Sequence, residues 1–277
     1  MRETAFAKLN LALHVRSREP DGYHRIETLF AFCEHGDTLS AASADDLSLA
    51  VTGPYAAALG DPVDNLVLQA ADALRRRHGV TRGAALTLDK RLPVASGIGG
   101  GSADAAAALR LLNRLWVIGA ADDDLIPLAA SLGADVPACL ASHTARGEGR
   151  GDRLLPVESA ELAGMPVLLV NPGVPLSTGQ VFAAWDGVDR GPLANLPPLA
   201  AAQQGRNDLE APAKALAPAV VEVLERLGES PGLILARMSG SGATCFALFE
   251  SERQRDAASA RLAASNPGWW RLASRLR

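Results

Sequence analysis

Cysteine, aromatic residues and long apolar runs are scarce in this chain. Its 277 residues include only three cysteines, Cys33, Cys139 and Cys245, with no spacing typical of a zinc or redox site. No apolar run approaches the roughly 18 to 20 residues that a membrane-spanning helix needs. Lys8 and Asn10 interrupt the one candidate core of a secretory signal. We therefore expect a cytoplasmic protein with reduced thiols.

An excess of positive charge is also missing. The formal net charge is −4, from 27 Lys and Arg against 31 Asp and Glu, so no global basic field attracts nucleic acid. Apolar residues make up 48% and charged residues 21%, which is typical of a globular chain. A chain of this length fits two domains. We expect small-molecule partners, no nucleic acid or membrane partner, and a monomer or weak homodimer.

Glycine is concentrated in one loop. Residues 93–109 read as the end of a strand, a loop with four glycines among residues 97–101, and the start of an Ala-rich helix. Glycine lets the backbone curl and bring its N–H groups close to a ligand. The following helix adds unpaired N–H groups and the positive end of its dipole. The pattern predicts a phosphate site, and the alternative is a flexible turn capped by Ser102.

Three well-known phosphate loops do not match this segment. A Walker A loop ends in Gly-Lys-Ser or Gly-Lys-Thr, whereas here Gly101 precedes Ser102 and Ala103. A Rossmann fingerprint needs Gly or Ala where Ser102 stands. A protein-kinase loop comes with His-Arg-Asp and Asp-Phe-Gly signatures, which this chain lacks. The loop is therefore of another type.

Residues 93–106 resemble the second motif of the GHMP kinases, named for galacto-, homoserine, mevalonate and phosphomevalonate kinases. Three further segments are similar to the branch of that family that acts on 4-diphosphocytidyl-2-C-methyl-D-erythritol. These are residues 7–11 with the nearby Gly22-Tyr23-His24, residues 133–137, and residues 237–246. Because four motifs occur in order over most of the chain, it is identified as a member of this family.

The resemblance implies an α+β chain in the two-domain GHMP kinase fold. Residues 1–158 would form a ribosomal protein S5 domain 2-like domain with the ATP phosphate loop and the catalytic residues. Residues 159–277 would form a ferredoxin-like domain that completes the substrate site. The alternation of strands and helices after Met165 suits an antiparallel sheet with helices on one face. The implied reaction is ATP-dependent phosphorylation of the acceptor's 2-hydroxyl, in the non-mevalonate (MEP) isoprenoid pathway, with ATP and Mg²⁺.

The resemblance also implies the site residues. Asp135 would accept or orient the hydroxyl proton, and Lys8 would hold Asp135 ionised and stabilise the transferring phosphoryl group. The residues implied to bind ATP are Asn65, Pro93, Val94, Ala95, Ser96, Gly97, Ile98, Gly99, Gly100, Gly101 and Ser102. Ser102 is the hydroxyl expected near the metal. The residues implied to bind the acceptor are Asn10, Tyr23, His24, Asp135, Thr178 and Phe182, with Tyr23 and Phe182 sandwiching the cytosine and His24 bonding its edge.

Several of these residues also have a structural explanation. Lys8 and Asn10 share one face of a strand and suit plain surface. Asp64 or Asn65 suits the N-cap of a helix that ends before Gly79, and Asp135 suits a cap before Pro137. Phe182 suits a core position.

The chain departs from the family motif at two positions. Ala95 stands where a glycine is usual, and a positive φ there would cost about 1 kcal/mol or more. Ala103 replaces a common serine. Two rival functions are a sibling kinase acting on mevalonate or homoserine, and an inactive binding protein with the same fold. The first has no reason for Gly22-Tyr23-His24, and the second predicts loss of Lys8 or Asp135, which are both present.

Overall fold

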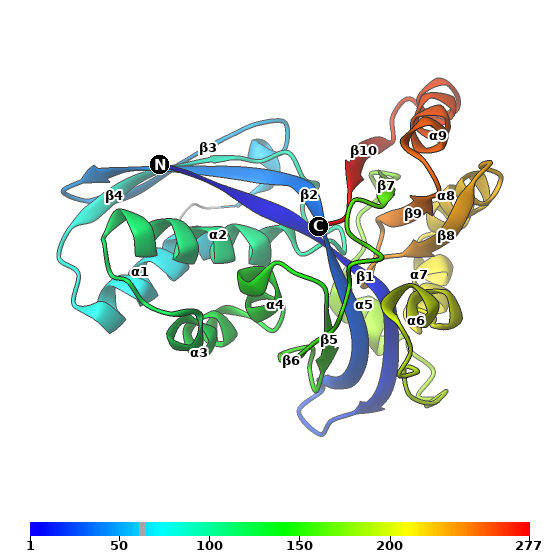
Figure 1. Cartoon of the computed structure of the whole chain (residues 1–277), viewed down its shortest axis with the longest axis horizontal. Coiled ribbons are helices and arrows are strands. Elements are labelled where there is room, and N and C mark those ends of the chain that lie inside the picture. The colour runs from blue at the N-terminus through cyan, green and yellow to red at the C-terminus, as the bar shows by residue number, and fades with distance from the viewer. Residues whose placement is uncertain (61–64) are drawn as a thin grey trace. The chain divides into compact units, whose positions relative to one another are not determined.

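The computed structural model describes residues 1–60 and 65–277 (Figure 1). These residues form two compact units, each built from several segments of the chain. Unit 1 comprises Met1–Lys8, His35–Val94 and Gly99–Ser142, and unit 2 comprises Leu9–Glu34, Ala95–Ile98 and His143–Arg277. The domain boundary expected after residue 158 stays a prediction.

Unit 1 is a sheet with helices packed along it. The long strands β1 (Arg2–Arg18) and β2 (His24–Ala44) each contribute one end to this unit. The other strands are β3 (Leu47–Thr52) and β4 (Gly83–Asp89), where β4 pairs antiparallel with β2 and parallel with β3. The helices are η1 (Ala56–Ala58), α1 (Leu66–His78), α2 (Gly100–Leu115), α3 (Asp122–Leu132) and α4 (Val136–Ala141). Figure 1 shows α1 and α2 side by side.

The helix after the glycine loop is built for close packing. Residues 105–108 are four consecutive alanines with no exposed surface, and Leu109, Leu112 and Trp116 are also buried. Helix α2 starts at Gly100, two residues before the predicted start at Ser102. Because alanine adds little volume, neighbouring helices approach closely, and α2 contacts α1 and α4 extensively.

Helix α1 has the two ends that the sequence predicts. The side chain of Asn65 accepts a hydrogen bond from the backbone N–H of Val67 at 2.9 Å, so the capping interpretation of Asn65 is confirmed. The helix stops at Gly79, whose φ of 63° is left-handed. The alternative cap, Asp64, lies outside the described residues.

Unit 2 contains a four-stranded antiparallel sheet in the order β10-β7-β9-β8. Its strands are β7 (Pro166–Asn171), β8 (Leu233–Met238), β9 (Cys245–Phe249) and β10 (Trp270–Arg275), with helices α8 (Ala219–Gly228) and α9 (Glu252–Ser265). The chain order β7-α8-β8-β9-α9-β10 is a split βαβ arrangement. The predicted ferredoxin-like topology is thus confirmed.

Unit 2 holds further short elements around this sheet. They are β5 (Ala145–Glu148), β6 (Arg153–Pro156), α5 (Thr178–Ala183), α6 (Pro198–Gln204) and α7 (Glu210–Leu216). Strand β5 pairs with β2 at Thr28 to Phe30 and with β6. The core includes Leu168, Val170 and Phe249, with Phe182 and Trp185 packed against it.

All three cysteines are buried and carry free thiols. Burial raises the pKa of the Cys139 thiol to about 12, and it raises the pKa of Cys33 and Cys245 as well. Their thiolates are therefore scarce at neutral pH. Over the described part of the chain, no helix has both the length and the apolar character needed to cross a bilayer.

Candidate active site

A lysine and an aspartate meet in unit 1. The Nζ of Lys8, on β1, lies 2.8 Å from the Oδ2 of Asp135, and the side chains are 4% and 40% exposed respectively. Lys8 is therefore not a surface residue, which the strand pattern left open. Asp135 occupies the N-cap position of α4, but its side chain makes no capping hydrogen bond. The pair presents a solvent-accessible carboxylate held by a buried ammonium.

The start of α2 is shaped around Lys8. Gly99 has a φ of 63° and is the N-cap of α2. A Cβ at Gly99 would lie 3.1 Å from the Cε of Lys8 and 3.2 Å from its Cβ. The missing side chain therefore makes room for the lysine stem beside the unpaired N–H groups of the helix. The ion pair and the predicted phosphate-binding helix start consequently lie close together within unit 1.

A second lysine in unit 1 lies between two carboxylates. Lys90 Nζ is 2.6 Å from Asp37 Oδ2 and 2.6 Å from Asp104 Oδ2, and the three side chains are at most 4% exposed. Burial raises the pKa of Asp104 to about 7, although Lys90 opposes the shift. Burial would lower the pKa of Lys90, but the two carboxylates outweigh it and raise that pKa. Neither Asp37 nor Lys90 was expected from the sequence to take part in a site.

The first part of the glycine loop belongs to unit 2, where it meets the third motif. Ala95 has a φ of 51°, so the conformation that would favour glycine is present at this position. Ser239 Oγ donates to the carbonyl of Gly97 at 2.9 Å. A Cβ at Gly97 would lie 2.4 Å from the backbone oxygen of Ser239 and 2.7 Å from that of Gly242. The two backbones are in contact here, so a side chain at Gly97 would overlap the third motif.

Two predicted acceptor-binding residues contact neighbours of unit 2. Asn10 is buried and donates from Nδ2 to Thr28 Oγ1 at 2.8 Å, while its Oδ1 has no hydrogen-bond partner among the described residues. Such a buried acceptor suits a ligand donor such as a hydroxyl. Thr178 begins α5, and its Oγ1 lies 2.9 Å from Ser241 Oγ in the third motif. The third motif thus contacts both the phosphate loop and a predicted acceptor residue.

Three aromatic rings of unit 2 form a cluster. The rings of His24 and Phe182 have centroids 4.9 Å apart and are tilted by 39°. Trp185 meets His24 edge-on at 5.6 Å, and its Nε1 is buried with no partner among the described residues. Burial, followed by the charge of Arg18, lowers the pKa of His24. At neutral pH, His24 therefore offers one donor and one acceptor nitrogen. Sequence reasoning missed Trp185, which lies two residues after the end of α5, in a segment with no clear periodicity.

Tyr23 is 57% exposed, and the guanidinium of Arg150 lies over its ring. Phe182 is half-buried and packs against the core as well as His24. Phe182 therefore has the contacts of a core residue and also the contacts of a residue in an aromatic site. The structure places Phe182 on His24 and Tyr23 under Arg150, and the sandwich around a base stays a prediction.

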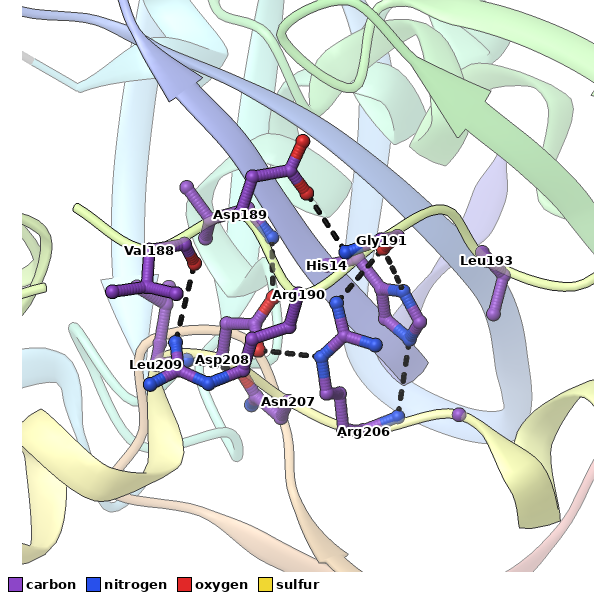
Figure 2. Close-up of polar contacts among 12 residues, drawn as sticks. His14, Val188, Asp189, Arg190, Gly191, Leu193, Arg206, Asn207, Asp208 and Leu209 are labelled. Carbon is purple, nitrogen blue, oxygen red and sulfur yellow. Dashed lines mark hydrogen bonds and ion pairs between the residues drawn. The ribbon is translucent and has the colours of Figure 1, made fainter. Parts of the chain in front are cut away.

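A buried histidine anchors the loop that follows α5 (Figure 2). His14 Nδ1 lies 3.2 Å from the carbonyl oxygen of Gly191, and its Nε2 accepts the backbone N–H of Arg206 at 3.2 Å. Arg206 also donates to Gly191 and to Asp208. Since Nε2 accepts, Nδ1 carries the proton and the ring is neutral. The side chains of His14 and Arg206 therefore hold Gly191 of this loop near β1, beside the backbone bridge between Leu13 and Asn207.

Few side chains of the described residues are placed to bind a metal ion. Among residues 1–60 and 65–277, no group of three or more His, Cys, Asp or Glu side chains could hold one. Asp104 is engaged by Lys90, which leaves the Ser102 hydroxyl and the Asp135 carboxylate of the expected donors. Mg²⁺ usually keeps several waters and binds one or two carboxylates plus substrate phosphates. The sparse donor set fits such a hydrated ion.

Comparison with known proteins agrees with this fold and with these motifs. The family model "GHMP kinases N terminal domain" matches residues 65–143, and "GHMP kinases C terminal" matches residues 189–268. These two matches lie on either side of residue 158. The chain belongs to the GHMP kinase family.

The names of individual relatives are more specific than the name of the family. The chain is 62% identical over 277 residues to 4-diphosphocytidyl-2-C-methyl-D-erythritol kinase of Rhizorhabdus wittichii, covering 99% of this chain and 94% of that protein. A crystal structure of 4-(cytidine 5'-diphospho)-2C-methyl-D-erythritol kinase is 36% identical, with a TM-score of 0.83, and covers 100% and 99% of the two chains. Homoserine kinase from Cytophaga hutchinsonii shares the fold at 17% identity and a TM-score of 0.69, covering 98% and 95%.

Proposed function

We propose that this chain is an ATP-dependent kinase that phosphorylates the 2-hydroxyl of 4-diphosphocytidyl-2-C-methyl-D-erythritol, a step toward isoprenoid precursors. The observation that carries the proposal is the Lys8–Asp135 ion pair, 2.8 Å long, in a chain whose full-length relatives bear that enzyme's name. Its partners would be these two small molecules, and it would act in the cytoplasm as a monomer or weak homodimer.

Asp135 would act on the attacking hydroxyl. Its carboxylate is 40% exposed, so a substrate can reach it, and the ammonium of Lys8 lies 2.8 Å from it. A positioned base of this kind contributes about 10²- to 10⁴-fold to a rate. Lys8 also supplies positive charge where the transferring phosphoryl group would pass. Phosphoryl transfer depends mainly on such positioning and charge neutralisation.

The phosphates of ATP would bind at the glycine loop and the start of α2. Helix α2 begins at Gly100 with no side-chain cap, and the first N–H groups of a helix have no partner within it, so the helix start and its dipole favour an anion there. Ser102 would contribute its hydroxyl to Mg²⁺. When bound, Mg²⁺ neutralises charge on the phosphate oxygens. Asn65 would line the nucleotide in addition to capping α1.

The cytosine of the acceptor would bind at the aromatic residues of unit 2. Tyr23 and Phe182 would stack on the base, and each such contact contributes about 1 to 3 kcal/mol. The neutral His24 ring would bond the polar edge of the base. Asn10 and Thr178 would hold the polar tail, since Asn10 Oδ1 is a buried acceptor with no partner among the described residues. We expect His24→Ala to raise KM for the cytidine acceptor far more than KM for ATP.

The test is ADP release from Mg·ATP with 4-diphosphocytidyl-2-C-methyl-D-erythritol, beside mevalonate and homoserine as rival acceptors. Wild type should turn over the cytidine acceptor alone, and Asp135→Asn should lose about 10²-fold or more of kcat. Asp123→Asn, at an exposed position in the first turn of α3, is the matched control and should keep wild-type kcat. Turnover of another alcohol would discard the acceptor, and ATP binding without turnover would favour a binding protein.

A further inference from the structure

We propose that Asp37, Lys90 and Asp104 form a positioning cluster that holds the start of α2 in the geometry needed to bind the phosphates of ATP. The inference rests on the proposed function, because it assumes that ATP phosphates bind at this helix end. It assigns a role to three buried charged side chains that do not touch the reacting atoms.

The cluster joins three separate elements of unit 1. Asp37 lies on β2, Lys90 directly follows β4, and Asp104 lies on the second turn of α2. The Nζ of Lys90 is 2.6 Å from one oxygen of each carboxylate. The side chain of Asp37 is 0% exposed, that of Lys90 is 1% exposed and that of Asp104 is 4% exposed. Contacts this short between fully buried charges fix the positions of all three elements.

The same cluster holds both ends of the glycine loop. The Oδ1 of Asp37 accepts the backbone N–H groups of Arg91 and Leu92, at 2.5 Å and 2.8 Å, just before the loop. Beyond the loop, a Cβ at Gly100 would lie 3.1 Å from Lys90 Nζ, so the ammonium lies directly against the first residue of α2. Glycine restricts the backbone less than any other residue does. The loop therefore depends on fixed ends to present its N–H groups in one arrangement.

Stability alone is a poor explanation for this arrangement. Burying charges is expensive, and apolar residues of similar size often replace a buried ion pair with no loss of stability. Asp104 Oδ1 is also buried without a hydrogen-bond partner among the described residues, which adds to that cost. The neighbouring helix positions 103 and 105–108 are alanines. An alanine at position 104 would therefore suit the helix, and stability alone does not account for a carboxylate there.

The experiment measures the affinity for Mg·ATP without acceptor, by titration calorimetry, in Asp104→Ala and in Asp104→Asn. Alanine removes the ion pair between Lys90 and α2 but leaves the ion pair between Lys90 and Asp37, whose charges cancel. Asparagine keeps an oxygen that can accept from Lys90 and is the matched control. We expect Kd for Mg·ATP to rise about tenfold in Asp104→Ala and to stay within about twofold in Asp104→Asn. KM for the acceptor should change by less than about twofold in both.

Wild-type affinity in Asp104→Ala, or an equal loss in both variants, would overturn the inference. If Asp104→Ala does not fold, Asp104→Ser removes the same ion pair with a small polar side chain and carries the same expectation. Wild-type protein that binds no Mg·ATP would overturn the proposed function itself. Wild-type protein that binds Mg·ATP and turns over the acceptor, with no loss in Asp104→Ala, would overturn the inference alone.

Discussion

The guanidinium of Arg150 lies 4.1 Å from the centre of the Tyr23 ring. Arg150 also donates to the carboxylates of Glu19 and Asp21, and Asp21 in turn accepts the backbone N–H of Tyr23 at 3.1 Å. The turn before β2 is thus attached to the turn between β5 and β6. One face of an exposed ring carries a cation, which fixes the orientation of the ring.

Arg150→Met should weaken binding of the cytidine acceptor. A cation–π contact at an exposed site contributes about 0.5 to 1 kcal/mol, so we expect KM for the acceptor to rise about two- to fivefold. KM for ATP and kcat should not change. Steady-state kinetics with each substrate varied in turn measures this. Arg153→Met is the control, because Arg153 pairs with Glu148 in the same hairpin and leaves Tyr23 alone. Equal shifts in both variants would contradict the assignment.

Gly97→Ala should destabilise the protein. Its φ of 78° disfavours a side chain, and the new Cβ would lie 2.4 Å from the backbone oxygen of Ser239. Strain and overlap together should lower the free energy of unfolding by about 2 to 4 kcal/mol. Urea unfolding measures it. The converse change in the same loop, Ala95→Gly, should raise that free energy by about 0.5 to 1 kcal/mol, since Ala95 has a φ of 51°. A loss in both variants would contradict this interpretation.

Val117→Gly should stabilise the protein. Val117 follows the end of α2 with a φ of 55°, and its side chain is 81% exposed. The N–H of Ile118 bonds the carbonyl of Asn113, and that of Val117 bonds Arg114, which is a Schellman motif with valine where glycine is preferred. We expect a gain of about 0.5 to 1 kcal/mol in unfolding free energy.

The mirror experiment uses another left-handed helix end of unit 1, at Gly79. Gly79 ends α1 with a φ of 63° and has nothing near its missing Cβ. Gly79→Ala should therefore lose about 1 kcal/mol through backbone strain alone. Urea unfolding of both variants checks the pair. Finding that Val117→Gly is the less stable of the two would refute the strain argument.

His14→Asn should flatten the decline of stability in mild acid. Burial, followed by the charge of Arg206, lowers the pKa of His14 below 6.5. As the pH falls below about 6.5, the unfolded chain binds a proton that the folded chain does not, so the unfolded state gains stability. Above that pH the residue contributes no slope. Urea unfolding between pH 7.5 and 5 should therefore give a smaller slope in the variant, on the order of one proton less. Parallel curves would contradict it.

The sequence predicts the local elements around the motifs well. In the sequence, Gly133 marks the end of α3, and the apolar run of residues 245–249 coincides with β9. The family motif raised the question of a positive φ at Ala95, and the φ there is 51°. Helices α5, α6 and α7 were not predicted. Each has only six or seven residues, which is too short for a clear helical period.

The site was harder to predict where it depends on contacts between distant residues. Lys8 and Asp135 were paired through the resemblance, and their ion pair is present. The Lys90 cluster was missed, because Asp37 and Lys90 lie outside the motifs and nothing local links them to Asp104 within the second motif. The alternation around Leu9 suggested one solvated face, but Asn10 and His14 are buried. A strand buried on both faces keeps the same alternation when its second face carries polar side chains.

The burial of all three thiols makes this chain a convenient host for spectroscopic labels. Maleimide reagents need an accessible thiolate, and Cys33, Cys139 and Cys245 offer neither access nor low pKa values. A cysteine introduced at the exposed Val188 would be the one reactive thiol. A fluorophore there would report movement of the loop after α5 as ligands bind, with no need to remove native residues first.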